Sequence, residues 1–335
     1  MKDLVVAAVD DGHYNLKVDL GKSAPFAMPA RIRAGRIAQV DMQGRADGIE
    51  SQAEYTIGES RYTVGALSGM PLAFDGFACS EQNIVLTQHA LQLAGLAGCG
   101  IHLVTGLPMR TFFGANKRKD GALIDAKVEA FKQVVISDVT DPVVVERHTV
   151  VPQAVAAWYD WTIQDGDSGP IRMGERERAG VAIVDIGGRT TDFAILQGGS
   201  LDLARSGSID AGMLDVRSNL REEIRLRYKL NTAPSDAVVD EAMRSGVISV
   251  YGKQHDVMDL RKDAVSELMT QIRAGCISHI GQGAELSEVV FCGGGASVQY
   301  MQEALDGLFA HQSILPEPLF ANARGMRKFG QFVAG

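Results

Sequence analysis

The sequence predicts an α/β fold made of two related halves, and three features of the chain support this class. Short β-like runs alternate with helix-like segments along all 335 residues, as in α/β proteins. A polar, glycine-rich and charged segment at 164–180 separates the halves and is expected to be a surface loop. A strand–Asp-x-Gly–turn–strand pattern occurs at Asp10 and again at Asp185. The two copies lie 175 residues apart, about half the chain, which predicts a duplicated domain.

The expected elements follow from the apolar periodicity of the chain. Runs of apolar, often β-branched residues predict strands at Leu4–Val9, Leu16–Leu20, Ile101–Thr105, Val143–Val151, Val181–Val184, Phe193–Leu196 and Val289–Cys292. Apolar residues at helical spacing predict helices at Asn83–Ala97, Ala122–Gln133, Gln153–Thr162, Leu214–Leu230, Ala237–Ser245, Leu260–Ile280 and Val298–Ala310. Strands and helices therefore occur in both halves.

The composition excludes several classes of function. Apolar residues make up 46% of the chain and charged residues 22%, as in globular proteins. A formal net charge of −8 argues against direct binding of nucleic acid, which needs clustered Lys and Arg. The cysteines lack metal-ligand spacing, and no apolar stretch reaches the length that crosses a bilayer. The N-terminal run lacks a signal-peptide pattern, so we expect a cytoplasmic protein without a membrane partner.

Each Asp-x-Gly turn joins two apolar strands and carries groups suited to phosphate. Gly12, Gly187 and Gly188 let backbone N–H groups approach phosphate oxygens because no Cβ stands in the way. Thr190 and Thr191 can donate hydroxyl hydrogen bonds to the same oxygens. Both turns are therefore expected to cradle phosphate groups.

Carboxylates in such turns need a cation beside the phosphates. Asp10 and Asp185 alone would repel a phosphate, so the sequence predicts Mg²⁺ between these carboxylates and the phosphates. The ion would be held through water, because Mg²⁺ keeps much of its hydration shell. Lys17 lies on the strand that leaves the first turn and could reach the β- or γ-phosphate as a point charge. The alternative for Lys17 is an ordinary exposed strand residue.

A third glycine-rich turn, Gly293–Ala296, follows an apolar strand and opens a helix. A nucleoside could lie against this bare backbone, and the start of a helix favours negative charge. Familiar nucleotide motifs are absent, since Leu16 occupies the first-glycine position of a P-loop ending at residues 21–23. No G-x-G-x-x-G follows a strand to open a helix, and no G-x-S-x-G marks a hydrolase elbow.

The three turns in this order resemble the nucleotide site of the actin, chaperone and sugar-kinase ATPase superfamily. Within it, the chain is most similar to the ParM/StbA plasmid-segregation actins and their archaeal actin-like relatives. The resemblance spans essentially the whole chain. It is carried by Asp10-Asp11-Gly12…Lys17, Pro152-Gln153, Asp185-Ile186-Gly187-Gly188-Arg189-Thr190-Thr191-Asp192, Gly293-Gly294-Gly295-Ala296 and the closing segment 320–330.

This resemblance implies a two-lobed actin-like ATPase fold, with duplicated RNase H-like domains and the nucleotide in the cleft. The first domain is expected to comprise residues 1–153 and 321–335, with a smaller insert at about 25–78. The second is expected to comprise residues 154–320, with a smaller insert at about 217–275. ATP, or GTP, and Mg²⁺ are the implied cofactors.

The hydrolytic position of the family falls on Gln153, which follows a proline. A neutral Gln can orient the attacking water but cannot act as a general base, which implies slow hydrolysis. Gln153, Asp10 and Asp185 form the implied catalytic set, and the two aspartates are the implied metal ligands.

The resemblance also implies a wider nucleotide-binding set. A turn before the helix at 214–230 carries Gly212, which would allow close backbone approach, while the ribose contact stays open among Arg221, Glu222 and Arg225. The role of Arg189, facing phosphate or capping the turn in solvent, also stays open. The implied set is Asp11, Gly12, His13, Tyr14, Asn15, Lys17, Gly187, Gly188, Arg189, Thr190, Thr191, Gly212, Gly293, Gly294, Gly295 and Ala296.

The function that the resemblance implies is a filament-forming ATPase that segregates or positions plasmid DNA. Its implied partners are further copies of the chain and a DNA-binding adaptor protein of the ParR type, with no direct contact to nucleic acid. A small-molecule (sugar) kinase of the same superfamily is the alternative, although it needs a catalytic Asp and a sugar pocket for which the sequence shows no clear candidate. A chaperone-type ATPase would need a further peptide-binding domain.

Overall fold

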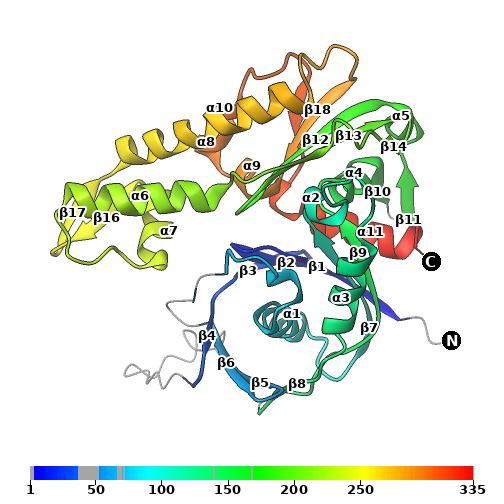
Figure 1. Ribbon diagram of the computed structural model, residues 1–335, viewed down its shortest axis with the longest axis horizontal. Helices are drawn as coiled ribbons and strands as arrows, with labels where there is room; N and C mark the ends of the chain where they lie inside the picture. Colours follow the sequence, from blue (N-terminus) through cyan, green and yellow to red (C-terminus); the bar gives the residue numbers. More distant parts are fainter. Residues whose placement is uncertain are drawn as a thin grey trace. The chain divides into compact units, whose positions relative to one another are not determined.

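A computed structural model describes residues 4–36, 53–65, 70, 72–138, 140–166 and 169–334 (Figure 1). The chain forms two compact units. The first unit comprises Met1–Leu107, Thr111–Pro152 and Asn322–Gly335, and the second comprises Pro108–Arg110 and Gln153–Ala321. Each unit has its own buried apolar core, so each is described by itself.

The first unit is built on a five-stranded sheet in the order β3-β2-β1-β7-β9. Strands β1 and β2 form an antiparallel hairpin, and β7 lies parallel to both β1 and β9. Most apolar residues of β1 and β7 are buried, with Val5 and Val6 half-buried, so both strands were visible in the sequence as continuous apolar runs. The strands are β1 (Val5–Asp11), β2 (Asn15–Asp19), β3 (Phe26–Pro29), β7 (Gly100–Leu107) and β9 (Val144–Pro152).

Three longer helices accompany this sheet. Helix α1 (Glu81–Leu93) begins at Ser80, whose side chain accepts a hydrogen bond from the Asn83 backbone, and α3 (Gly121–Ala130) is capped in the same way by Asp120. Helix α11 (Ala321–Phe332) returns the C-terminal segment to the first unit. Two shorter elements are the 3₁₀ helix η2 (Phe77–Cys79) and α2 (Met109–Phe112), whose first two residues belong to the second unit.

A second, four-stranded sheet of the first unit has the order β4-β6-β5-β8. The sequence did not predict its strands, because they are short and several of their residues are exposed. The insert expected at about 25–78 includes β3 to β6, but its residues 37–52, 66–69 and 71 lie outside the described residues. The strands are β4 (Ile32–Ala34), β5 (Ala53–Ile57), β6 (Ser60–Val64) and β8 (Val135–Ser137).

The second unit repeats the connectivity of the first. Strands β12 and β13 form an antiparallel hairpin, and β18 lies parallel to β12, as β7 lies parallel to β1. The duplication expected from the two Asp-x-Gly turns is therefore confirmed. The strands of this sheet are β12 (Gly180–Ile186), β13 (Thr191–Gln197), β14 (Ser200–Leu201), β15 (Gly207–Ile209), β18 (Glu288–Cys292) and β19 (Gln312–Ile314).

Helices α6 and α8 lie along one another in this unit (Figure 1). Ile224 of α6, Leu268 of α8 and Phe193 of β13 belong to the same buried apolar core. The helices are α4 (Val155–Thr162), α5 (Gly174–Arg178), α6 (Met213–Arg227), α7 (Asp236–Ser245), α8 (Met258–His279), α9 (Gly293–Ala296) and α10 (Gln299–Leu305), with the 3₁₀ helix η3 (Pro318–Phe320). Two hairpins complete the unit, β10 (Ile163–Gly166) with β11 (Gly169–Arg172) and β16 (Val247–Val250) with β17 (Lys253–Asp256).

Two sequence expectations about secondary structure are wrong. The segment 164–180 is not a loop, because β10, β11 and α5 occupy most of its described residues. Its strands are mainly exposed, so they lack the apolar alternation that would reveal them. The helix expected from Gln153 begins two residues later, at Val155, because Ala154 has a φ of 63° and cannot lie within a right-handed helix.

Within the described part of the chain, no helix has the length and apolar character needed to span a membrane.

Candidate functional site

The first hairpin holds a buried ion pair at its closed end. Asp10 lies opposite Lys17 in the register of β1 and β2, and Lys17 Nζ donates to Asp10 Oδ2 at 2.9 Å. Both side chains are at least nine-tenths buried on the residue scale, at 3% and 9% exposed. A Cβ on Gly12 would come within 3.1 Å of Lys17 Nζ. The absence of a side chain at Gly12 therefore leaves room for the lysine over the turn.

Asp11 points instead into the interior of the first unit. Its Oδ2 accepts hydrogen bonds from Lys127 Nζ on α3 and from Asn83 Nδ2 on α1, both at 2.6 Å. Lys127 is fully buried and also donates to the Gly106 carbonyl at 2.7 Å. Two lysines thus balance the two adjacent aspartates at the end of β1. This geometry favours a supporting role for Asp11 beneath the turn, and its contact with a nucleotide stays a prediction.

The remaining residues of the first turn are tied to neighbouring segments. The His13 ring lies 4.7 Å from the Phe77 ring, centroid to centroid. The Tyr14 carbonyl accepts from the Ala30 backbone at 3.0 Å, and Asn15 pairs with Pro29 in the sheet. These contacts fix the shape of the turn.

The second hairpin places Asp185 at the end of β12, 4% exposed. The two threonines predicted to donate to phosphate already donate within the protein. Thr190 Oγ1 donates to Asp192 Oδ2 at 3.1 Å, and Thr191 Oγ1 donates to the Ala211 carbonyl at 2.8 Å. Each hydroxyl has a single proton, so contact with phosphate would require these bonds to be exchanged.

The two glycines of this turn hold the start of α6. The Gly187 and Gly188 carbonyls accept from the backbones of Met213 and Leu214, at 3.1 and 2.8 Å. A Cβ on Gly212 would lie only 2.4 Å from the Gly188 carbonyl oxygen. Gly212 therefore has a packing reason for lacking a side chain, in addition to its predicted nucleotide contact.

Two of the three consecutive glycines in α9 are required by the end of β12. Gly293 has a φ of +89°, and a Cβ there would lie 2.2 Å from Asp185 Oδ1. A Cβ on Gly295 would lie 2.3 Å from Ile186 Cγ2, whereas one on Gly294 would meet nothing closer than 3.6 Å. The structure thus brings α9 (Gly293–Ala296) against Asp185 and the strand β12 of the second hairpin. Gly294 is thus the one glycine of α9 at which a side chain would meet no close contact.

Arg189, which the sequence left unexplained, lies close to a carboxylate. Its Nε is 4.0 Å from Asp210 Oδ1, and Arg110 forms a two-pronged ion pair with the same carboxylate. The hydrogen bond from Arg110 lowers the pKa of Asp210. This cluster could not be predicted from the sequence, because Arg110 and Asp210 lie 100 residues apart.

The candidate ribose contacts differ in their surroundings. Arg221 is paired with Asp236 of α7, and burial lowers the pKa of Arg221. Arg225 and Glu222 pair with each other on the exposed face of α6. Gln153 lies half-buried between β9 and α4.

Each hairpin carries a group suited to a hard cation. Asp10 in the first unit and Asp185 in the second offer carboxylate oxygens, which Mg²⁺ prefers. In the described ranges no three potential metal-ligating side chains lie together. Such an ion would therefore depend on water and phosphate oxygens for its other ligands, as Mg²⁺ commonly does.

Asp192 should give the second unit a distinctive pH dependence. Burial raises its pKa from 3.8 to about 6, although hydrogen bonds from Ser208, the Met109 backbone and Thr190 oppose the shift. The folded state therefore holds this proton more tightly than the unfolded state. The contribution of the protonated Asp192 carboxyl to the free energy of unfolding is fully present below about pH 4. It is lost as the pH rises through about 6.

Between pH 4 and pH 7, the free energy of unfolding of the wild type should fall by about 2–3 kcal/mol relative to that of Asp192→Asn, because asparagine does not titrate. Urea denaturation followed by tryptophan fluorescence measures this, because Trp158 and Trp161 lie in the second unit. A difference between the two proteins that stays constant with pH would contradict the assignment.

Two family models match separate parts of the chain. A family model described as plasmid segregation protein ParM, N-terminal, matches residues 5–163, and one described as archaeal actin homologue MreB-like, C-terminal, matches residues 183–307. No curated protein sequence matches the chain significantly.

Solved structures of actin homologues align with nearly the whole chain. A 15-stranded ParM filament from Clostridium botulinum matches with a TM-score of 0.77 at 20% identity, over 97% of this chain and 98% of that one. The archaeal actin homologue Ta0583 in complex with ADP matches at 0.74 and 18%, over 98% and 99%. Bacillus thuringiensis ParM with ATP matches at 0.67 and 14%, over 97% and 98%. At these identities the likeness shows a common, actin-like fold. The two family models together match residues 5–163 and 183–307, and they place the chain among the actin-like proteins of the ParM (StbA) and archaeal MreB-like kind.

Proposed function

We propose that the protein is a nucleotide-dependent, filament-forming ATPase that positions plasmid DNA through an adaptor protein. The observation that carries the proposal is the repeated hairpin. In each unit an antiparallel hairpin carries a buried aspartate, Asp10 or Asp185, one residue before the end of its first strand and beside glycine-rich backbone. Similar folds have been solved with ADP and with ATP, which supports a nucleotide at these hairpins.

In the proposed reaction, Gln153 orients a water toward the γ-phosphate of ATP or GTP. Asp10 and Asp185 would hold a hydrated Mg²⁺, which supplies neutralisation of the phosphate charge. Lys17 pairs with Asp10 at 2.9 Å and would share its charge between that carboxylate and a phosphate. The glycine backbone of the second turn and of α9 completes the proposed binding set.

We propose the two actin-like domains to be residues 1–153 with 321–335, and residues 154–320, close to the division into compact units. Further copies of the chain are the proposed partners, supported by the filament structure of a ParM with the same fold. The net charge of −8 favours reaching DNA through an adaptor of the ParR type over direct contact. A plasmid cargo would place this activity in the cytoplasm.

Gln153→Ala tests the hydrolytic assignment. We expect it to slow phosphate release by about 10–100-fold, since the water loses its orienting group, while nucleotide binding is retained. Phosphate release from ATP and from GTP, with Mg²⁺ or with EDTA, measures the rates.

Unchanged hydrolysis in this variant would remove Gln153 from the reaction. Phosphorylation of a small sugar in a coupled assay, with no hydrolysis in its absence, would favour the kinase alternative. The absence of any nucleotide binding by the wild-type protein would overturn the proposed function itself.

A further inference from the structure

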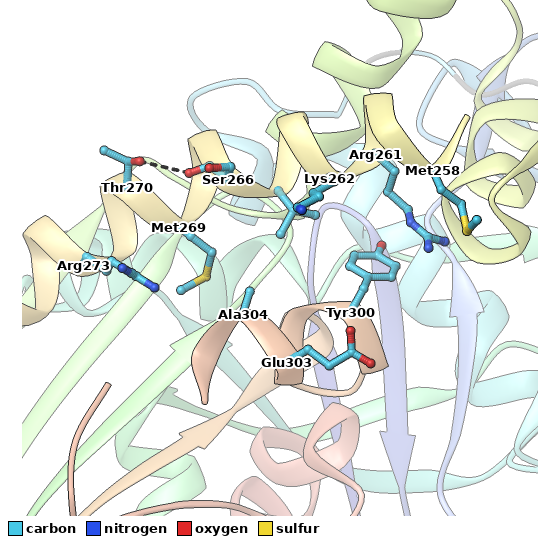
Figure 2. Close-up of a pocket in the computed structure, with 11 residues that line it drawn as sticks. Met258, Arg261, Lys262, Ser266, Met269, Thr270, Arg273, Tyr300, Glu303 and Ala304 are labelled. Atoms are coloured by element: carbon cyan, nitrogen blue, oxygen red, sulfur yellow. Dashed lines mark hydrogen bonds between the residues drawn. The ribbon is translucent and has the colours of Figure 1, made fainter. Parts of the chain in front are cut away.

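A groove of about 540 Å³ lies in the second unit between α8 and α10 (Figure 2), and no residue of β12 or β13 lines it. Its apolar side chains come from both helices. Val265 and Met269 of α8 are 6% and 4% exposed and form the base of the groove. Tyr300 and Ala304 of α10 face them from the other side (Figure 2).

The groove follows the axis of α8 for several turns. Its lining residues on this helix run from Met258 to Arg273, which corresponds to about 22 Å at 1.5 Å per residue. Met258, at one end, is 51% exposed. Two methionines in the lining give an adaptable apolar surface. A long apolar groove between two helices has the form in which proteins bind an amphipathic helix.

Basic side chains border the groove without acidic partners. Lys262 and Arg273 are exposed and form no ion pair with any residue that the structure describes. Arg261 donates to the Met243 carbonyl at 2.8 Å and lies over the Tyr300 ring at 4.6 Å. Glu303 is the one acidic residue in the lining.

Most other arginines that the structure describes in the second unit have a carboxylate partner, unlike the basic residues of the groove. Those with a carboxylate partner within 4.0 Å include Arg205, Arg217, Arg221, Arg225, Arg227 and Arg244. The groove is bordered by three cationic side chains and one anionic side chain, so it is locally positive although the chain has a net charge of −8. Charge complementarity therefore favours an acidic occupant.

We propose that the groove binds an acidic amphipathic helix of a partner protein. Apolar residues on one face of that helix would contact Val265, Met269 and Tyr300. Its flanking carboxylates would pair with Lys262 and Arg273. This contact uses neither hairpin and does not depend on nucleotide hydrolysis.

Two synthetic peptides of about 16 residues, enough to span the groove as helices, provide the test. Both carry leucines on one face, and their flanks carry glutamate in one peptide and lysine in the other. Fluorescence anisotropy with the full chain, without nucleotide and at low salt, should show the acidic peptide binding at least about tenfold more tightly. Rising ionic strength should reduce this preference.

The double variant Lys262→Glu/Arg273→Glu should reverse the preference, so that the lysine peptide binds more tightly. A matched control, Lys253→Glu/Arg118→Glu, changes the net charge equally at exposed positions outside the groove and should behave as the wild type. Ala304→Trp, which fills the groove without changing charge, should weaken both peptides. Circular dichroism establishes that each variant is folded.

Equal binding of the two peptides, or a preference that the groove variant does not change, would overturn the proposal. A second copy of the chain is the competing occupant. If neither peptide binds and Lys262→Glu/Arg273→Glu abolishes nucleotide-driven sedimentation, the groove is a contact between copies and the proposal is wrong. If the wild type shows no sedimentation yet the peptide preference and its reversal hold, the groove stands and the proposed function fails.

Discussion

Replacing Lys127 by methionine is expected to lower the free energy of unfolding by about 3–5 kcal/mol. The side chain of Lys127 is 0% exposed and that of Asp11 is 2% exposed. Methionine fills a similar volume but leaves the Asp11 carboxylate buried without its cation, with Asn83 as its remaining hydrogen-bond partner. Burial of an unpaired charge is among the most destabilising single changes. Both tryptophans lie in the second unit, so far-UV circular dichroism in urea is the suitable probe.

Two further variants separate the ion pair from general damage. Lys132→Met removes an exposed lysine paired with Glu129 and should change stability by less than about 1 kcal/mol. Asp11→Asn combined with Lys127→Met removes both charges and should recover much of the loss, since the penalty comes from the unpaired partner. If Lys127→Met were as stable as Lys132→Met, the buried pair would have no such role.

Asp185→Asn is expected to reduce nucleotide hydrolysis by about 10²–10³-fold. The side chain keeps its size and its place at the end of β12, where α9 packs against it, but loses the charge proposed to hold hydrated Mg²⁺. The variant should also need more Mg²⁺ to reach half of its maximal rate. Phosphate release measured across a Mg²⁺ titration gives both quantities.

Asp306→Asn is the matched control for this change. Asp306 is an exposed residue of the same unit, at the end of α10, and its amide variant should hydrolyse nucleotide at the wild-type rate. A wild-type rate and an unaltered Mg²⁺ dependence in Asp185→Asn would show that this carboxylate does not serve the cation.

The main sheets could be predicted from sequence because their central strands are buried on both sides. The apolar runs expected at Val181–Val184 and Val289–Cys292 coincide with β12 and β18, where every apolar residue is essentially inaccessible. The small sheet of the first unit could not be predicted in this way. Its strand β8 pairs with β5, almost 80 residues earlier, and such distant pairing leaves no local pattern. The exposed β10–β11 hairpin was not predicted, because its sequence lacks the alternation of apolar and polar residues that indicates a strand.

The candidate site shows the same limit. The two Asp-x-Gly turns were recognisable because strand, aspartate and glycine are contiguous in the chain. The partner of Asp11 was not, since Lys127 lies 116 residues away on a helix whose pattern is ordinary. Contiguous glycines in α9 suggested room for a nucleoside, whereas Gly293 and Gly295 are needed for packing against β12. The sequence identifies the residues of a turn, but it does not identify the distant residues that pack against them.

The central claim, that nucleotide drives this chain into filaments, is tested most directly by sedimentation with parallel electron microscopy. Purified protein is examined over a range of concentrations with ATP or GTP and Mg²⁺, and in matched samples without nucleotide. The account predicts sedimentable filaments above a critical concentration only when nucleotide and Mg²⁺ are present. Protein that binds nucleotide but remains in the supernatant without filaments, at every concentration and salt condition, would contradict it.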